Sequence, residues 1–277
     1  MVFYPTAEII ADSINVETGD RLTTFVLEYH RFIHSEFMTY RVFSRNASSS
    51  RAIPVDKMID RVLSKEVEPL HWGKNQKGMQ ARAVLDEDER EKARDAWDNA
   101  RYQAVIHARE MVKIGVHKQI VNRLLEPFST ITVVCTATNY ENFFEQRCHP
   151  DAQPEIQMLA AEMKFVYTAS FPKKLNPGDW HLPFFNPEND SHLSLSQRLK
   201  VCTGRSARVS YLNHAGVRHE NDDVRLHDDL LDSTPKHLSP FEHCAVAAAS
   251  PGKYANLSGW KHYRYLLEND WRLDSFK

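Results

Sequence analysis

The chain has 277 residues, and its 35 lysine and arginine residues nearly balance 37 aspartate and glutamate residues, so the formal net charge is −2 with histidine neutral. This balance gives no support to a nucleic-acid coat or a protein of the membrane surface, because both usually carry a basic excess. A hydrophobic fraction of 42% and a charged fraction of 26% are typical of a globular protein with a sizeable core. We therefore expect a folded, soluble protein that binds neither nucleic acid nor membrane.

The N-terminus and the cysteines bear on the compartment. No apolar run approaches the roughly 20 residues of a membrane span, and Met1 to Pro5 lack the basic and apolar regions of a signal peptide. No two of the four cysteines form a CxxC pair, which favours reduced thiols over a disulfide framework or a zinc site. These features predict a cytoplasmic protein.

Glycine is scarce, with 9 residues in the chain and no GxG spacing. This excludes a Rossmann dinucleotide fingerprint, in which glycine lets the backbone approach pyrophosphate. The segment 73–78 only superficially resembles a phosphate-binding loop, because Met79 and Gln80 follow where Lys and Ser or Thr are needed. Any bound nucleotide must therefore be held by arginine and hydroxyl side chains.

The first elements read as a hairpin. Segments 8–11 and 21–27 are extended in pattern and flank a turn at Gly19 and Asp20. A short helix over 31–40 follows, although continuation of the strand fits the pattern nearly as well. Residues 44–51 are predicted to form a polar loop, because three consecutive serines between arginines match no helix or strand period.

The longest helical signal runs from Asp86 to about Ile114, with Gly115 as its stop. Small or apolar residues recur at helical spacing and predict one buried stripe: Ala93, Trp97, Ala100, Ala104, Ala108 and Met111. A short helix carries Ile120, Arg123 and Leu124 up to Pro127, and the β-branched run 130–138 predicts a buried strand.

Further helices are expected over 139–146, over 155–167 and, beyond a proline-rich stretch, over 196–209 and 222–231. The helix over 155–167 places Ile156, Leu159, Met163 and Val166 on one face. Residues 169–193 hold four prolines without a sustained period and predict a covering loop. Without a repeat or a clear linker, we expect a fold of class α+β: a single domain over 1–277 with an antiparallel sheet and a long-helix bundle.

The densest polar group lies between Glu36 and Arg51. Its guanidinium and hydroxyl groups suit a phosphate without requiring glycine, and its members are Glu36, Tyr40, Arg41, Ser44, Arg45, Asn46, Ser49 and Arg51. The alternative is a solvated serine-rich turn.

Two further groups are candidates. Arg123 and Arg147 each lie among apolar neighbours, so each guanidinium must reach solvent, bind an anionic ligand or pair with a carboxylate such as Glu126 or Glu145. His237, Glu242 and His243 invite a metal hydrolase interpretation. However, Pro240 breaks the helix that would align them, and no third ligand is evident, so no metal is predicted.

Together these segments resemble the flavin-dependent thymidylate synthases. The signature of that family is RHR, seven residues and Ser; here Thr39-Tyr40-Arg41, seven residues and Ser49 have that spacing, and Arg51 follows. Two further stretches are similar to the family's Asn-Phe-Leu-x-x-Arg and Ala-Gln-x-Glu-Ile segments: 142–147 and 152–156. Segment 121–127 is similar to a helix that brings another arginine to the nucleotide.

Two other family segments are present but displaced. Stretches like 206–211 and 237–243 precede the RHR signature in short members of the family, whereas here they follow Arg147. The chain thus resembles a circular permutation of the short form, which is tolerated where natural termini lie close together. The permuted order predicts that residues 237–242 lie beside residues 40–51 and Arg147 in the folded assembly.

The resemblance implies methylation of carbon 5 of the uracil in dUMP, with methylenetetrahydrofolate as one-carbon donor and NADPH as reductant through FAD. It assigns a catalytic part to Arg147 and Ser49, the serine as a binding hydroxyl and not a nucleophile. The residues carried over for substrate binding are Glu36, Ser49, Ser50, Arg51, Arg123 and Arg147. Those carried over for FAD are Tyr40, Arg41, Asn142, His237, Ser239 and Glu242.

The chain also departs from the family pattern. Thr39 and Tyr40 replace the Arg and His of the RHR signature, and Ala47 replaces a Glu. Thr138 stands where the family often has Arg, and Glu36 stands where Gln is common. Tyrosine can stack on a flavin or donate to it but carries no imidazolium charge. An inactive or altered-specificity pyrimidine-nucleotide-binding homologue therefore stays open. The resemblance further implies a homotetramer whose active sites lie at subunit interfaces. The long helix suits packing between subunits, but its stripe would serve a helix bundle within one chain equally well.

Overall fold

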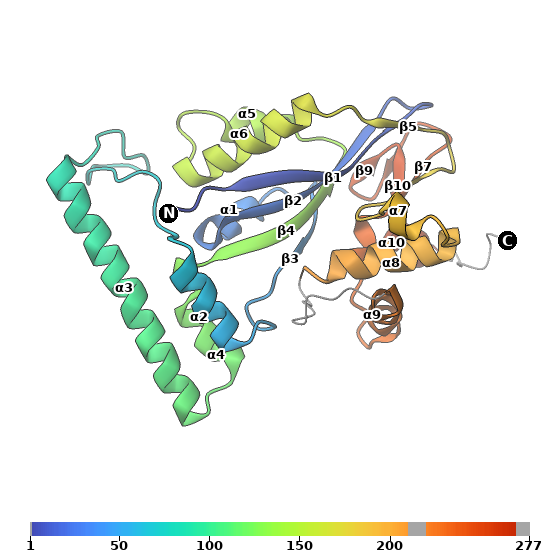
Figure 1. Cartoon of the computed structure of the whole chain (residues 1–277). Helices are drawn as coiled ribbons and strands as arrows, with labels where there is room; N and C mark the ends of the chain where they lie inside the picture. Colours follow the sequence, from blue (N-terminus) through green and yellow to red (C-terminus); the bar gives the residue numbers. More distant parts are fainter. Residues whose placement is uncertain (1, 210–219, 270–277) are drawn as a thin grey trace.

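The computed structural model describes residues 2–209 and 220–269 (Figure 1). It is built around a five-stranded sheet with the order β3-β4-β2-β1-β5. Neighbouring strands are antiparallel except for β1 and β5, which are parallel. The α+β class and the largely antiparallel sheet are thus confirmed.

The predicted hairpin is formed by β1 (Thr6–Asn15) and β2 (Arg21–His30). Gly19 adopts φ +75° in the connecting turn, a conformation that glycine adopts without steric cost. The Asn15 amide donates to the carbonyls of Ala248 and Gly259, 2.9 Å to each, so the turn end of the hairpin is tied to the C-terminal part of the chain. The following segment is helical, with η1 (Arg31–Ile33) and α1 (His34–Phe37), so the helix was the correct alternative.

β4 (Thr130–Ala137) is the predicted buried strand and pairs with β2 along its whole length. The prediction of a loop over 44–51 was wrong in its first half, because β3 (Ser44–Ala47) pairs with β4. The reason is that buried and half-buried residues alternate here although the sequence is polar. Ser44 and Asn46 are buried and hydrogen-bonded, while Arg45 and Ala47 are half-buried. An apolar period cannot reveal such a strand.

Two helices cover one face of the sheet, α5 (Glu141–Arg147) and α6 (Pro154–Ala169), seen above it in Figure 1. The predicted inner face of α6 is confirmed, since Ile156, Leu159 and Met163 are fully buried. They pack against Phe25, Leu27 and Tyr29 of β2 in the largest hydrophobic cluster. Burial of such side chains stabilises the fold by about 1.5–3 kcal/mol each.

A second cluster lies at the other end of the sheet, where α2 (Val55–Ser64), α3 (Glu87–Ile114) and α4 (Lys118–Val121) pack together (Figure 1). The α3 boundaries confirm the prediction: Asp86 forms a capping box with Glu89, and Gly115 ends the helix at φ +88°. The 3-10 helices η2 (Asn122–Leu124) and η3 (Glu126–Phe128) continue from α4 to β4.

The predicted buried stripe of α3 was partly wrong. Ala108 is buried, but Ala100 is exposed, and Arg101 is only 5% exposed. Arg101 buries its alkyl stem and donates from Nη1 to the carbonyl of Val62 at 2.9 Å, while Asp98 accepts from its guanidinium. A long charged side chain can fill a core position in this way when its head group is paired.

The stretch 169–193 is not a loop without regular structure. It contains β5 (Lys173–Leu175), which extends the main sheet, β6 (Trp180–His181), which joins a second sheet, and the short helix α7 (Pro187–Asp190). These elements are too short to show a period, because strands of two or three residues give no alternation.

The C-terminal part packs against the β5 end of the sheet (Figure 1). The predicted helices are α8 (Leu195–Ala207) and α9 (Glu220–Asp232). The remaining elements are η4 (Ser239–Glu242), β7 (Ala245–Ala247), β8 (Lys253–Tyr254), β9 (Leu257–Ser258), β10 (Trp260–His262) and α10 (Tyr263–Glu268). Within residues 2–209 and 220–269, no helix combines the length and apolar character needed to cross a membrane.

Candidate functional site

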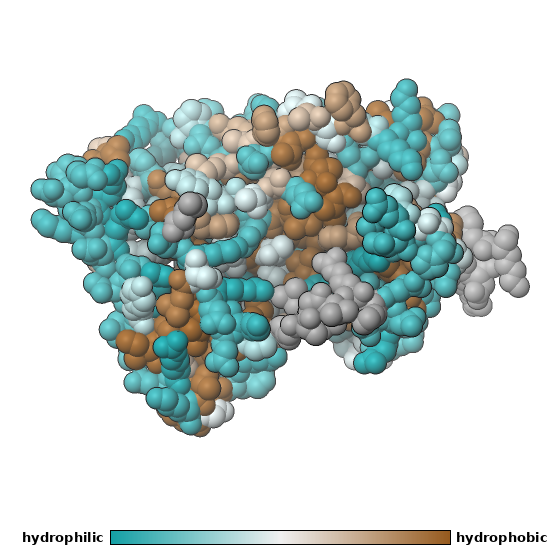
Figure 2. Space-filling view, viewed as in Figure 1, coloured by the Kyte–Doolittle hydropathy of each residue, from teal (hydrophilic) through white to brown (hydrophobic). Residues whose placement is uncertain are grey.

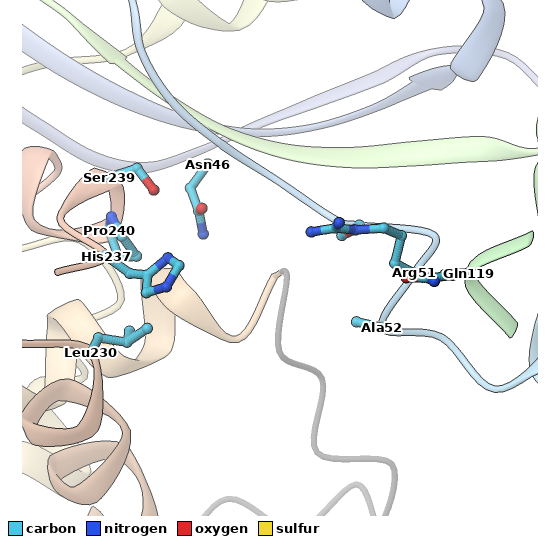
Figure 3. A pocket seen from close by; sticks show the side chains of 9 residues that line it. Asn46, Arg51, Ala52, Gln119, Leu230, His237, Ser239 and Pro240 are labelled. Carbon is cyan, nitrogen blue, oxygen red and sulfur yellow. The ribbon is translucent and has the colours of Figure 1, made fainter. Parts of the chain in front are cut away.

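A cavity of about 500 Å³ separates the loop after β3 from the segment that leads into η4. Its walls contain Ser49 and Arg51 from the loop, and His237 and Ser239 from the C-terminal part. Figure 3 shows Asn46, His237 and Ser239 grouped on one side, with the Arg51 side chain reaching toward them from the other. Segments some 190 residues apart in sequence therefore meet at one site.

The loop that carries Ser49 and Arg51 is firmly held. The backbone N–H of Ser48 donates to the carbonyl of Thr132 at 2.9 Å, so the loop continues from the sheet without a break. The fully buried amide of Asn122 donates to the carbonyls of Ser50 at 2.7 Å and Ile53 at 2.9 Å. Since Ser48 and Ser50 are also buried, the alternative of a solvated serine-rich turn was wrong.

Glu126 gathers a charged cluster behind this loop. Its carboxylate accepts from Ser50 Oγ at 2.6 Å and pairs with Arg31 at 3.0 Å and Arg123 at 2.9 Å. Burial disfavours the ionised carboxylate, but the Ser50 hydrogen bond and the two guanidinium groups outweigh it, so the pKa of Glu126 lies below its ordinary value. The pairing of Arg123 with Glu126, considered from sequence as the structural alternative, is present.

Arg147 belongs to a different corner. Its guanidinium pairs with Glu36 and donates from Nε to the Tyr40 hydroxyl at 2.8 Å, and that hydroxyl donates to Gln146 at 2.8 Å. The partner of Arg147 is thus Glu36 and not Glu145. We call this group, Glu36, Tyr40, Gln146 and Arg147, the arginine corner; its members are absent from the cavity lining.

A second cavity of about 250 Å³ adjoins Tyr40. Tyr40, Phe43 and Phe143 provide aromatic walls, and Asn142 and Lys253 are among its polar residues. The hairpin of β8 and β9 supplies Lys253 and is fastened in place, since Asn256 donates to the Val42 carbonyl and to Ser44 Oγ, 3.0 Å each. Sequence reasoning missed Lys253 and Asn256, because no motif marks them.

The remaining predicted residues have separate roles. Arg41 is exposed, and Glu242 pairs with Arg264 at 2.9 Å. His243 is fully buried, and its Nδ1 lies 2.8 Å from the Thr136 hydroxyl. In the part of the chain that the structure describes, no group of three His, Cys, Asp or Glu side chains could hold a metal ion.

The predicted site residues therefore fall into two sets. The structure brings Ser49, Ser50, Arg51 and Arg123 close to one another and places His237 and Ser239 across the cavity. Glu36, Tyr40 and Arg147 lie together in the arginine corner, and Tyr40 shares the second cavity with Asn142. The predicted neighbourhood of 237–242 is present for the Asn46–Arg51 end, while Arg147 of the same chain is not among the residues that line the cavity between them.

Comparisons with known proteins agree with this architecture. The family model described as thymidylate synthase complementing protein matches residues 22–173, more than half of the chain. A crystal structure of the UMP/dUMP methylase PolB from Streptomyces cacaoi bound with 5-Br UMP is similar in fold, with a TM-score of 0.51 and 15% identity over 60% of this chain and 89% of that one.

A second structure of that methylase, bound with 5-Br dUMP, has a TM-score of 0.45 and 17% identity over 54% of this chain and 67% of that one. No curated protein sequence matches the chain.

Proposed function

The chain belongs to the thymidylate synthase complementing protein family, and on that premise we propose that it methylates carbon 5 of the uracil in dUMP to give dTMP. The one-carbon unit comes from methylenetetrahydrofolate, and the reducing equivalents come from NADPH through FAD. The protein is then a flavin-dependent thymidylate synthase.

The observation that carries the proposal is the cavity between the Ser49–Arg51 loop and the His237–Ser239 segment. A guanidinium and hydroxyl groups beside one another suit the phosphate of a nucleotide, because they offer fixed donors to its oxygens. The Asn122 and Glu126 contacts hold these groups in place before any ligand arrives. Such preorganised donors orient a substrate and stabilise developing charge without reorganisation at the moment of reaction.

The arginine corner supplies the other part of the proposed nucleotide site. Arg147 is held by Glu36 and Tyr40 but keeps 21% of its side chain exposed, so its guanidinium is accessible to a ligand. Because the residues of the corner do not line the cavity of their own chain, we propose that each complete site combines the cavity of one subunit with the corner of another.

A homotetramer provides this arrangement, as the resemblance implies. Apolar side chains remain exposed on α3 and α4, where Ile106, Ile114 and Ile120 are 45%, 78% and 52% exposed. Figure 2 shows hydrophobic surface around the lower end of α3. Exposed apolar surface of this kind often marks contacts between subunits.

The residues around Tyr40 fit part of a flavin nucleotide. Phe43, Phe143 and Tyr40 provide flat apolar walls, the Asn142 amide can both donate and accept, and Lys253 adds a positive charge suited to phosphate. We assign the holding of FAD to these residues together with His237 and Ser239; Arg41 and Glu242 stay in the proposal as weaker contributors. When bound, FAD supplies the redox chemistry that connects NADPH to the methyl product.

We also place the reaction in the cytoplasm. All four cysteines are free thiols, and Cys135, Cys202 and Cys244 are fully buried. This accords with a reducing compartment, where structural disulfides are rare.

The deciding experiment starts from the purified full-length chain. Flavin absorbance after incubation with FAD, calorimetric binding of dUMP, and dTMP formation with NADPH and methylenetetrahydrofolate are all expected. Binding of dUMP without product would favour the inactive homologue, and product from another pyrimidine nucleotide would favour altered specificity. A protein that binds neither FAD nor dUMP contradicts the proposal.

A further inference from the structure

A continuous chain of buried hydrogen bonds crosses the main sheet where the C-terminal part packs against it. Ser13 Oγ lies 2.9 Å from His181 Nδ1, and Thr24 Oγ1 lies 2.8 Å from His181 Nε2. The Thr24 and Thr136 hydroxyls are 2.7 Å apart, and Thr136 Oγ1 lies 2.8 Å from His243 Nδ1. Each of these five side chains is at most 4% exposed. None of them belongs to the predicted nucleotide or cofactor residues.

The hydrogen-bonding capacity of these groups allows only two arrangements. Burial lowers the pKa of both His181 and His243 to about 3, so both rings are neutral near pH 7 and each has one N–H. Each threonine hydroxyl has a single proton and no hydrogen-bond partner outside this series among the described residues. If every hydroxyl proton is used, the direction of the Thr24 to Thr136 bond fixes the direction of the others. Either all donors point from Ser13 toward His243, or all point the opposite way.

This constraint couples the two histidines. In the first direction both rings accept at Nδ1 and carry their proton on Nε2; in the second both carry it on Nδ1. The two rings therefore have the same tautomer as long as both threonine protons are hydrogen-bonded, since opposite tautomers would leave one of these buried protons unused. The His243 Nε2 atom is buried and has no hydrogen-bond partner among the described residues, so the Thr136 bond is the anchor of this ring.

This series of hydrogen bonds also joins the two walls of the larger cavity. Thr136 of β4 is in register with Ser44 of β3, two residues before Asn46 at the cavity edge. His243 directly follows η4, which begins with Ser239 of the opposite wall. The bond from Thr136 to His243 is therefore a short, water-excluded link between the sheet that carries one wall and the helical turn that carries the other.

We propose that Thr136 and His243 are positioning residues, which hold the Ser239 wall at its working distance from the Asn46–Arg51 wall and so set the affinity for the nucleotide. This role rests on the proposed function, because it takes the cavity to be the nucleotide site. The residues touch no ligand themselves and act through η4 and β3. Removing the Thr136 hydroxyl takes away the hydrogen-bond partner of the buried His243 Nδ1 and leaves Thr24 bonded to His181 alone. An unpaired polar atom is costly in a water-excluded interior.

The coupling of the histidines is tested directly by long-range proton–nitrogen NMR spectra of the imidazole rings in the full chain, with His181 and His243 assigned by substitution. The expected result is two neutral rings of one shared tautomer at pH 7. Opposite tautomers, or a protonated ring at pH 7, would contradict the proposed coupling of the two histidines through this series of hydrogen bonds. This measurement needs no ligand, so it stands whether or not the protein binds dUMP.

The positioning role is tested by dUMP titration calorimetry on Thr136→Val, Thr136→Ser and Thr132→Val. Thr132 lies on the same strand and face but outside the chain of hydrogen bonds, so Thr132→Val is the matched control. Thr136→Val is expected to raise the Kd for dUMP about tenfold, the order expected from an unpaired buried group. Thr136→Ser, which keeps the hydroxyl, and Thr132→Val should remain within about twofold.

The alternatives give different results. If Thr136→Val lowers the melting temperature but leaves the Kd unchanged, the bond serves stability alone and the positioning role is wrong. If the wild-type protein binds no dUMP, the proposed function fails and the positioning role falls with it. If the wild-type protein binds dUMP but Thr132→Val raises the Kd as much as Thr136→Val does, the result would likewise count against a specific role for Thr136.

Discussion

The Ser49–Arg51 loop and the arginine corner present similar groups to a ligand but are built differently. The loop is fixed by backbone and buried amide contacts, with Asn122 donating to two of its carbonyls. The corner is held mainly by contacts among partly exposed side chains, Arg147 to Glu36 and Arg147 to Tyr40. Fixing by buried backbone contacts survives loss of a surface side chain, whereas a surface ion pair contributes little to stability. Substitutions that loosen the loop should therefore lower both dUMP affinity and the free energy of unfolding, whereas substitutions in the corner should lower dUMP affinity alone.

The strongest test of this difference is Arg147→Ala. If Arg147 binds dUMP as proposed, loss of its guanidinium should weaken dUMP binding at least about a hundredfold, because charge-assisted hydrogen bonds are the strong ones. The melting temperature should hardly change, because the ion pair with Glu36 is partly exposed. Calorimetry and thermal unfolding measure the two quantities. Arg109→Met, at an exposed position of α3, is the control, and unchanged dUMP affinity in Arg147→Ala would contradict the assigned site.

A mixing experiment tests whether loop and corner come from different subunits. Arg51→Met and Arg147→Ala should each be inactive, but co-refolded mixtures should recover about a quarter of wild-type dTMP formation, because random assembly joins intact halves at that frequency in a symmetric oligomer. Recovery of dTMP formation requires active sites that combine residues of two subunits. Full assembly without any recovery would show that both halves act within one subunit.

The stability side of the comparison is addressed by Asn122→Ala. This change removes both amide bonds to the loop and is expected to lower the free energy of unfolding by about 2 kcal/mol, with weaker dUMP binding as a consequence. Tyr40→Phe, which removes only the hydroxyl shared by Arg147 and Gln146, should cost less than about 1 kcal/mol. Urea unfolding measures both, and equal losses would remove the distinction between the two regions.

The loop shows how far sequence could predict this protein. The hairpin, α3 with its caps, β4 and α6 follow from turn residues and clear periods. β3 was missed because its inward residues, Ser44 and Asn46, are polar and are satisfied only by distant partners: Asn256 bonds Ser44, and the carbonyl of Ser206 accepts from Asn46. A local pattern cannot reveal partners that lie 160 or more positions away.

The same limit applied to the site. The motif spacing predicted Ser49, Arg51 and Arg147 as site residues, because the chemistry of binding an anion restricts the residue types. It offered the pairing of Arg123 with Glu126 but could not show that Arg31 joins them, since this depends on how η3 packs beside η1. Lys253 and Asn256 lay outside every motif and became visible only through the hairpin that carries them.

The buried histidines behind the cavity make its side of the molecule sensitive to acid. Their folded pKa of about 3 lies below the usual 6.5, so the unfolded chain binds more protons as the pH falls, and stability present above about 6.5 is lost toward 3. Each of His181 and His243 should lower the free energy of unfolding by about 1 kcal/mol between pH 6.5 and 5.5.

Urea unfolding at these two pH values measures this loss. His181→Gln should reduce the pH-dependent loss even if it lowers stability overall, whereas His107→Gln, at an exposed position of α3, should not. An unchanged pH dependence in His181→Gln would mean that this ring is not kept neutral by the fold.

The smallest effect is expected at the second cavity, beside the arginine corner. Lys253 is exposed on β8, so its charge is screened by solvent, and Lys253→Met should weaken FAD binding only about three- to tenfold. Riboflavin has the same ring system without phosphate, and its affinity should not change if Lys253 acts on the phosphate. Lys261→Met is the matched control, because Lys261 lies over the Tyr254 ring of the same hairpin and outside the cavity lining. Flavin fluorescence titration measures all these affinities, and an equal loss for FAD and riboflavin would mean that the hairpin contacts the ring system instead.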